Sequence, residues 1–131
     1  MIGLLIVTHC DLGKELLNAA EFIVGRMEAV ESVSITQTLD SKEIMKEIEK
    51  KLSNLDKGQG IIILTDMFGG TPSNISLSFL KEGQVEVLTG VNLPMVIAIA
   101  QNRSNLGLVE LAEKAQEAGR MSISLAGKLL E

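Results

Sequence analysis

The sequence predicts an α/β protein of three layers, built on an open and mostly parallel sheet with strand order 2-1-3-4. Apolar runs of about five to eight residues alternate with amphipathic stretches of about ten to sixteen, and this alternation is typical of βαβ units. The length of 131 residues is that of one domain with one core. We therefore expect a single domain over residues 1–131.

Composition excludes several classes of protein. The chain is 46% apolar and 22% charged, with a net charge of −5, one His and one Cys. One Cys cannot form an internal disulfide, and one Cys with one His is too few for a zinc site of the Cys/His type. The acidic balance, with no basic stripe and no Trp or Tyr, argues against nucleic acid as a partner.

The sequence also indicates a soluble, cytoplasmic protein. The longest apolar run, Pro94 to Ala100, has about seven residues, whereas a membrane-spanning helix needs about 20. The start, Met1 to Val7, has no basic region and no small-residue cleavage site of the kind found in signal peptides.

The apolar character of each predicted strand indicates its place in the sheet. Ile2 to Thr8 and Gly60 to Thr65 are apolar throughout, as strands covered by helices on both faces are, so both are predicted to be central. Ser32 to Leu39 turns polar halfway along and is expected nearer an edge. Gln84 to Val91 is the fourth strand. Right-handed crossovers then give the order 2-1-3-4.

The intervening segments are predicted to be helices. Asp11 is expected to cap the first, and Asp40 with Glu43 resembles a capping box for the second. Their apolar stripes are Leu12, Leu16, Ala20, Ile23, Val24 and Met27 in the first, and Ile44, Ile48, Leu52 and Leu55 in the second.

Three more helices are expected in the second half of the chain. Thr71 and Pro72 are predicted as the N-cap and first position of one, Pro94 opens a short apolar helix to about Ala100, and Ser104 to Gly119 is amphipathic. Met121 to Leu125 alternates with period two, which fits an antiparallel C-terminal edge strand, although Leu125, Leu129 and Leu130 equally fit a helix.

This topology places the only histidine at a predicted ligand site. Ligands of open α/β sheets bind where the strand order reverses, outside the carboxyl ends of the strands. Here that point lies between the first and third strands, which are followed by His9 and by Asp66. A lone histidine is often only structural, but a neutral imidazole at this position is a potential nucleophile. Asp66 is a candidate to orient the ring and fix its tautomer.

The loop after the third strand supports anion binding. Gly69-Gly70 precede a predicted helix, and glycines at a helix N-terminus bring backbone N–H groups close to phosphoryl oxygens. The alternative is a turn needed only for the backbone. The loop has neither the Gly-x-Gly-x-x-Gly nor the Gly-Lys-Ser/Thr pattern, so nucleotide binding is not supported.

These residues favour a phosphohistidine carrier over an ATP-using kinase. A Cys-His-Asp hydrolase is the rival use of the same residues. Because Cys10 and His9 are adjacent in an extended chain, their side chains are poorly placed to act together. Cys10 is more simply a small residue that lines the turn.

Three segments resemble the enzyme IIA domains of the mannose class of the bacterial phosphoenolpyruvate:sugar phosphotransferase system. They are Ile6-Val7-Thr8-His9, the run from Leu64 to Asn74 (LTDMFGGTPSN), and Thr89 to Met95 (TGVNLPM). The resemblance covers nearly the whole chain and is carried by the order and spacing of the three. It identifies residues 1–131 as a single mannose-type enzyme IIA domain.

The resemblance implies a role for each site residue. His9 would accept a phosphoryl group from the histidine-containing phosphocarrier protein and pass it to an enzyme IIB domain, while Asp66 holds its ring. Thr71 matches a hydroxyl near the phosphoryl group. The pocket loop and a neighbouring loop would be formed by Met67, Phe68, Gly69, Gly70 and Asn92, although Asn92 is equally well read as a turn residue. Members of the family are homodimers that exchange a C-terminal edge strand.

Two comparisons refine this assignment. The phosphotransfer subunit of dihydroxyacetone kinase shares the early histidine, but the run from Phe68 to Asn74 is similar to the sugar-transport branch. Cys10 departs from the Gly or other small residue frequent after the family's histidine, so thiol oxidation is a potential liability. The family's chemistry implies no metal and no organic cofactor, and it involves the membrane only through permease components.

Other functions remain open at this stage. The same histidine would serve a regulatory module that reports metabolic state without moving sugar; neighbouring IIB, IIC and IID genes would favour transport instead. A flavodoxin-like domain that binds a small ligand predicts copurification of that ligand and no phosphorylation. The sugar is not encoded in this chain, because specificity in this class belongs to the membrane components.

Overall fold

The computed structural model describes residues 1–37 and 40–130, whose strands form one all-parallel sheet in the order β2-β1-β3-β4. This confirms the predicted α/β class and strand order. The strands are β1 (Gly3–His9), β2 (Val30–Ile35), β3 (Ile61–Thr65) and β4 (Val85–Thr89). Between and after them come α1 (Leu12–Val24), α2 (Ser41–Leu55), α3 (Thr71–Leu77), α4 (Leu93–Asn102), α5 (Leu108–Met121) and α6 (Ala126–Leu129).

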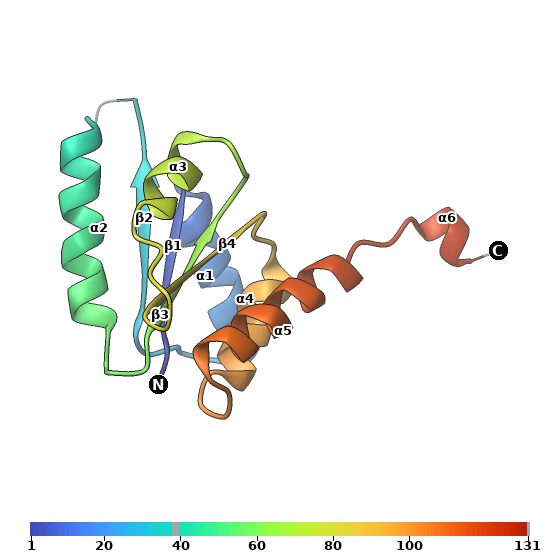
Figure 1. Ribbon diagram of the computed structural model, residues 1–131. Helices are drawn as coiled ribbons and strands as arrows, with labels where there is room; N and C mark the ends of the chain where they lie inside the picture. The colour runs from blue at the N-terminus through green and yellow to red at the C-terminus, as the bar shows by residue number, and fades with distance from the viewer. Residues whose placement is uncertain (38–39, 131) are drawn as a thin grey trace.

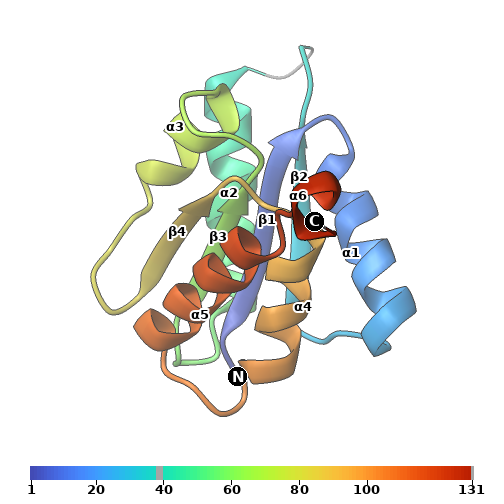
Figure 2. The same cartoon turned by 90° about the vertical axis from the view of Figure 1, so that its right-hand side faces the viewer.

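The helices make two outer layers around the sheet. In Figure 1, α2 and α3 lie on one face, and α4 and α5 lie on the other. Figure 2, turned by 90°, shows α1 beside α4 and α5 on that second face. Each face has its own apolar core: alternate residues of β1 point to α1, α4 and α5 (Leu4, Ile6) or to α2 (Leu5, Val7), and Ile2, just before β1, joins the first of these cores. β1 is therefore buried between both layers.

The central strands are the ones the sequence predicts. All five residues of β3 and the first six of β1 are buried, and the two strands pair in register from Gly3 opposite Ile61 to Val7 opposite Thr65. β2 is shifted toward the N-terminus relative to the predicted Ser32 to Leu39, since it begins at Val30 and ends at Ile35; Leu39 lies outside the described residues. Because β1 and β3 are neighbours, the residues that follow them meet at one edge of the sheet.

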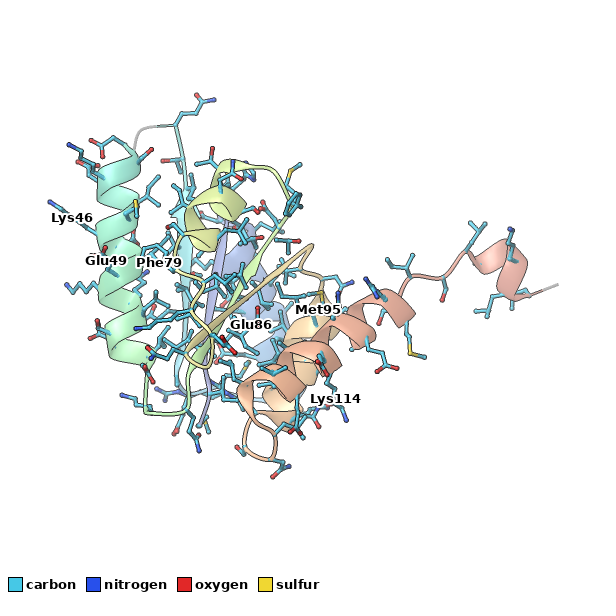
Figure 3. The ribbon with its side chains drawn as sticks, in the orientation of Figure 1. Lys46, Glu49, Phe79, Glu86, Met95 and Lys114 are labelled. Atoms are coloured by element: carbon cyan, nitrogen blue, oxygen red, sulfur yellow. The ribbon has the colours of Figure 1, made fainter. Side chains whose placement is uncertain are left out.

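Helix α2 follows the prediction closely. The Asp40 carboxylate caps it by accepting a hydrogen bond from the Glu43 backbone N–H at 2.9 Å. Ile44 and Ile48 are buried, whereas Lys46 and Glu49 lie on the outer face of the helix in Figure 3. The amphipathic pattern therefore placed the correct face on the sheet.

The predicted apolar stripe of α1 is correct in part: Ala20 is fully buried, and Leu16 and Met27 pack against the core. Leu12 and Ile23 are exposed, and the buried positions are Gly13, Leu17 and Ala20. A Cβ on Gly13 would lie only 3.0 Å from Cγ2 of Ile6, so the helix approaches the sheet through its smallest residue. The pattern missed Gly13 and Leu17 and included the exposed Leu12 and Ile23.

The C-terminal segment is not a strand in this chain. Helix α5 continues to Met121, beyond the predicted end at Gly119, and a short helix follows at Ala126–Leu129. The helical alternative for Leu125 to Leu130 is therefore correct, and the edge-strand alternative is wrong for the single chain. Figure 1 shows this segment extending away from the three layers. Of the described helices, none has both the length and the apolar character needed to cross a membrane.

A buried arginine closes the end of the sheet opposite His9. Arg103 follows α4 and is only 4% exposed. Its guanidinium donates hydrogen bonds to the carbonyl oxygens of Ile2, Glu28 and Ala29 at 2.6 to 3.0 Å. Burial lowers the pKa of Arg103, and the nearby charge of Glu28 acts in the opposite direction. The charge is thus satisfied mainly by backbone dipoles that join the chain before β1 to the segment before β2.

Candidate functional site

The histidine lies where the central strand leaves the core. His9 is the last residue of β1, and the six residues before it are buried, whereas its own side chain is 48% exposed. The next residue, Cys10, has a left-handed backbone (φ 49°) and donates its N–H to the Ile35 carbonyl at 2.9 Å. The chain therefore turns immediately after His9 and leaves the imidazole at the carboxyl edge of the sheet.

One carboxylate oxygen holds both the ring and the backbone of His9. Asp66 Oδ2 lies 2.8 Å from His9 Nδ1 and accepts the His9 backbone N–H at 3.0 Å, while Oδ1 accepts the Met67 N–H at 3.1 Å. An ionised carboxylate only accepts hydrogen bonds, so the ring proton belongs on Nδ1. In the neutral ring, Nε2 then carries the lone pair.

The electrostatics of Asp66 suit this arrangement. Burial raises the pKa of the carboxyl group, but the hydrogen bonds from the backbone and ring of His9, together with the imidazole charge, outweigh burial and lower the pKa below its ordinary value. Asp66 is therefore ionised at neutral pH and remains an acceptor for the ring.

The two glycines of the loop have different environments. Gly69 has a left-handed backbone (φ 90°), and no atom lies within 4 Å of where its Cβ would be. Gly70 has an extended backbone and adjoins the imidazole: its Cβ would be 2.9 Å from His9 Cε1 and 3.4 Å from Nε2. The exposed Met67 and Phe68 precede them.

Helix α3 begins beside the ring, one residue earlier than predicted. Gly70 is the N-cap, so Thr71 is the first helical residue and not the cap, because Gly70 already has the extended conformation that a cap requires. The helix N-terminus carries a partial positive charge and favours an anionic group at this place. Thr71 and His9 also share a cavity of about 350 Å³.

That cavity gives the ring an open neighbour of mixed character. Apolar side chains and hydroxyl, amide and thiol groups line it together; the lining residues are His9, Cys10, Ile35, Thr36, Gln37, Ser41, Ile44 and Thr71. Cys10 thus lines the turn, as predicted. The cavity exceeds the size of a phosphoryl group, which leaves room for part of a partner molecule.

The structure separates Asn92 from this group. Asn92 is the N-cap of α4, where its Oδ1 accepts the Met95 N–H at 3.2 Å and its Nδ2 donates to the Gly119 carbonyl at 3.1 Å. It lines a different cavity, of about 280 Å³, between β4 and α5. Figure 3 shows Met95 at the same junction of α4 and α5. These contacts are structural, so they favour the interpretation of Asn92 as a turn residue over a place in the pocket of His9.

Two polar residues near the site have roles that the sequence analysis did not predict: Thr8 was given no role, and Asp11 was expected to cap α1. The buried Thr8 hydroxyl accepts the Gly13 N–H at 2.8 Å and donates to the Cys10 carbonyl at 3.3 Å, which ties the start of α1 to the turn after His9. Asp11 occupies the N-cap position of α1 but makes no side-chain cap; its carboxylate instead accepts the Ser34 hydroxyl at 2.7 Å. A threonine at the end of an otherwise apolar strand is the signal that would have indicated Thr8.

A nucleophilic nitrogen, a carboxylate that fixes its tautomer and a helix N-terminus thus meet at the switch point of a parallel sheet, which is the equipment of a phosphoryl-transfer protein. Residues 3–116 match the model of the family described as "EIIA-man: PTS system fructose IIA component". The chain belongs to this family of IIA components, which are phosphotransferase components of the sugar phosphotransferase system.

Individual relatives agree with the family assignment. The sorbose-specific EIIA component of Lacticaseibacillus casei is 30% identical over 82% of this chain and 78% of its own length. The mannose-specific EIIAB component of Escherichia coli K12 is 28% identical over 93% of this chain, which spans only 38% of that longer protein. The crystal structure of the EIIA component of Streptococcus agalactiae has the same fold, with a TM-score of 0.88 at 24% identity over 98% of this chain and 99% of that one.

Proposed function

We propose that His9 accepts a phosphoryl group on Nε2 from the histidine-containing phosphocarrier protein and passes it to an enzyme IIB domain during sugar uptake. The observation that carries the proposal is the 2.8 Å contact between His9 Nδ1 and Asp66 Oδ2 on a ring that is 48% exposed. It leaves Nε2 as the nitrogen with a lone pair at the surface.

The transfer then needs only positioning and charge stabilisation. The Nε2 lone pair attacks the phosphorus of the donor's phosphohistidine, an N–P bond forms here while the donor's N–P bond breaks, and the electron pair stays on the donor nitrogen. The Nδ1 proton remains on the ring, where Asp66 stabilises the positive charge that develops. Passage to the IIB domain repeats these events in reverse.

The residues around the ring would assist the phosphoryl group. Thr71 directly follows Gly70, which adjoins Nε2, and it shares a cavity with His9; its hydroxyl and the N-terminus of α3 would stabilise the charge on the transferring oxygens. Met67 and Phe68, both exposed, would contact the partner proteins. Transfer from one histidine to another exchanges one N–P bond for a similar one, so its free energy change is close to zero. The proposed reaction therefore uses no metal or organic cofactor.

A phosphorylation assay tests the proposal. Incubation with phosphoenolpyruvate, enzyme I and the phosphocarrier protein is expected to label the chain with a phosphoryl group that is stable in alkali and labile in acid. The variant His9→Ala should remain unlabelled, and a cooperative thermal unfolding transition should show that it is folded. Labelling that persists in His9→Ala would show that the acceptor is another residue.

We further propose that residues 1–131 act as a single cytoplasmic domain and as a homodimer through the C-terminal segment. β4 is the edge of the sheet, with a hydrogen-bonded neighbour on one side only. Two cavities of about 280 and 240 Å³ lie along β4 and α5 and share Leu88 and Gln116. The segment that extends from α5 carries exposed Ile123, Leu125, Leu129 and Leu130, an apolar surface that a second copy would cover.

Light scattering tests the dimer directly. The full chain is expected to have twice the 14.1 kDa mass of one copy, and a variant that ends at Met121 should have the mass of one copy with its far-ultraviolet circular dichroism little changed. A full chain that elutes as a monomer at micromolar concentration, or a truncated chain that remains dimeric, contradicts this assignment.

A further inference from the structure

Gly70 does not need to be glycine for the sake of its backbone. Its φ of −87° and ψ of 171° are extended values that any residue adopts. Its neighbour Gly69 differs, since a φ of 90° is unfavourable for a residue with a side chain. Something other than main-chain conformation therefore accounts for the absence of a side chain at position 70.

The imidazole of His9 supplies that reason. A Cβ on Gly70 would lie 2.9 Å from Cε1 of the ring and 3.4 Å from Nε2, whereas carbon atoms in favourable contact are about 3.5–4.0 Å apart. Asp66 binds Nδ1 at 2.8 Å. The ring is thus confined between a carboxylate on one nitrogen and a bare Cα beside the other.

We propose that Gly70 is a positioning residue for phosphoryl transfer: its missing side chain keeps open the space in which the His9 ring binds Asp66 and presents Nε2. The proposal rests on the proposed function, because it assigns Gly70 to the presentation of the reacting nitrogen. A side chain at this position would tilt the ring away from Asp66 or displace the loop that carries Asp66. Either change would lengthen the contact that fixes the proton on Nδ1.

A side chain would also occupy the space where the phosphoryl group forms its bond. The would-be Cβ is 3.4 Å from Nε2, which places a methyl group beside the attacking lone pair. Gly70 is also the N-cap of α3, so the methyl group would stand between the ring and the start of the helix. Both effects act on transfer and leave the sheet and its two cores untouched.

Gly107 provides a matched control for Gly70→Ala. It is the N-cap of α5 with nearly the same backbone (φ −74°, ψ 172°), and no atom lies within 4 Å of where its Cβ would be. Gly107→Ala therefore makes the same chemical change at the same kind of position, with the same loss of freedom in the unfolded chain. The two substitutions differ in the close contact with the imidazole and in an ordinary contact with Met67 Cγ at 3.5 Å.

The first experiment measures phosphorylation and the tautomer of the ring. Gly70→Ala is expected to slow phosphorylation by the phosphorylated phosphocarrier protein about tenfold or more, the effect of losing a charge-assisted hydrogen bond. The ¹⁵N resonances of His9 should change from one tautomer to a mixture. Gly107→Ala should leave both measurements at their wild-type values. Wild-type phosphorylation and unchanged ring resonances in Gly70→Ala would overturn the proposal.

A second experiment isolates the contact with the ring and does not depend on phosphorylation. Gly70→Ala is expected to lower the Tm of the wild-type chain by more than the Tm of His9→Ala, because only the wild-type chain has an imidazole in contact with the methyl group, whereas the change of the N-cap residue is common to both. An equal fall in both backgrounds would mean that the methyl group collides elsewhere, for example with Met67 Cγ at 3.5 Å, and the proposal would be wrong. If the wild-type chain is not phosphorylated, the proposed function fails, while the ring resonances and the Tm comparison still decide the role of Gly70.

Discussion

Asp66→Asn is the substitution that most directly tests how the site works. The carboxylate contacts His9 Nδ1 at 2.8 Å and the His9 backbone N–H at 3.0 Å through one oxygen. A charge-assisted hydrogen bond contributes about 1.5–3 kcal/mol and a neutral one about 0.5–1.5 kcal/mol. Loss of the charge therefore removes about 1–1.5 kcal/mol of stabilisation from the positively charged ring, which corresponds to a transfer rate lower by about tenfold.

The two possible replacements differ in degree. Asparagine retains an oxygen that accepts from Nδ1, but its amide also donates, which favours the tautomer with the proton on Nε2. Asp66→Ala removes the acceptor altogether, so transfer should fall by about 10- to 100-fold. The expected order of rates is wild type, then Asp66→Asn, then Asp66→Ala.

Rapid-quench measurement of phosphoryl transfer from the phosphorylated phosphocarrier protein provides the assay. Asp56→Asn is the matched control, because Asp56 also accepts a backbone N–H, from Gly58 at 2.8 Å, but precedes β3 at the opposite edge of the sheet. It should transfer at the wild-type rate. Equal rates for wild type and Asp66→Asn would refute the idea that the carboxylate charge stabilises the ring.

Three further results are expected. The lowered pKa of Asp66 means that the unfolded chain binds the proton more readily than the folded one, so the carboxylate stabilises the fold above its ordinary pKa of 3.8, and this stability is lost as the pH falls through the pKa of the folded state. In urea titrations, the difference in stability between wild type and Asp66→Asn should therefore shrink on acidification from about pH 6 to about pH 3. A difference that stays constant would contradict this expectation. Arg103→Ala removes the guanidinium donor of three backbone carbonyls, of which that of Ala29 keeps the Leu4 N–H at 3.0 Å. It should lower the free energy of unfolding by about 2 kcal/mol or more, and a loss below about 1 kcal/mol would show that the carbonyls of Ile2 and Glu28 find other partners. Phe68→Ala removes a side chain that is 74% exposed, so KM for the donor should rise several-fold with kcat and Tm unchanged; an unchanged KM would place Phe68 outside the partner surface.

The sequence predicted the parts of the fold that depend on buried strands. β1 and β3 are apolar on both faces, so their central places and the meeting of His9 with Asp66 follow from topology. The apolar stripe of α1 followed only in part, because the close approach of Gly13 to Ile6 adds a buried position that has no apolar side chain to indicate it. Local patterns are informative about burial and say little about the exact approach of one element to another.

The same distinction applies to the site. That a carboxylate pairs with the ring could be predicted, but that a single oxygen also holds the His9 backbone N–H depends on the shape of the loop after β3. The Gly69-Gly70 pair has two interpretations from the sequence, a turn and an anion-binding loop; the contact of Gly70 with the imidazole appears only when β1 and β3 lie side by side. The sequence did not indicate the buried role of Arg103, because its partners are backbone carbonyls about 75 to 101 residues away, and backbone carbonyls have no sequence signal.

The fixed ring has a consequence for the order of events in a relay. His9 is held at its backbone and at Nδ1 by Asp66, and Gly70 adjoins its other edge, so the imidazole cannot swing from one partner to another. Under the proposed function, donor and acceptor would approach the same nitrogen from the same side, and each would leave before the other arrives. We therefore expect the two partners to compete for this face of the protein, and the overall rate of phosphoryl transfer to be limited by the dissociation of each complex.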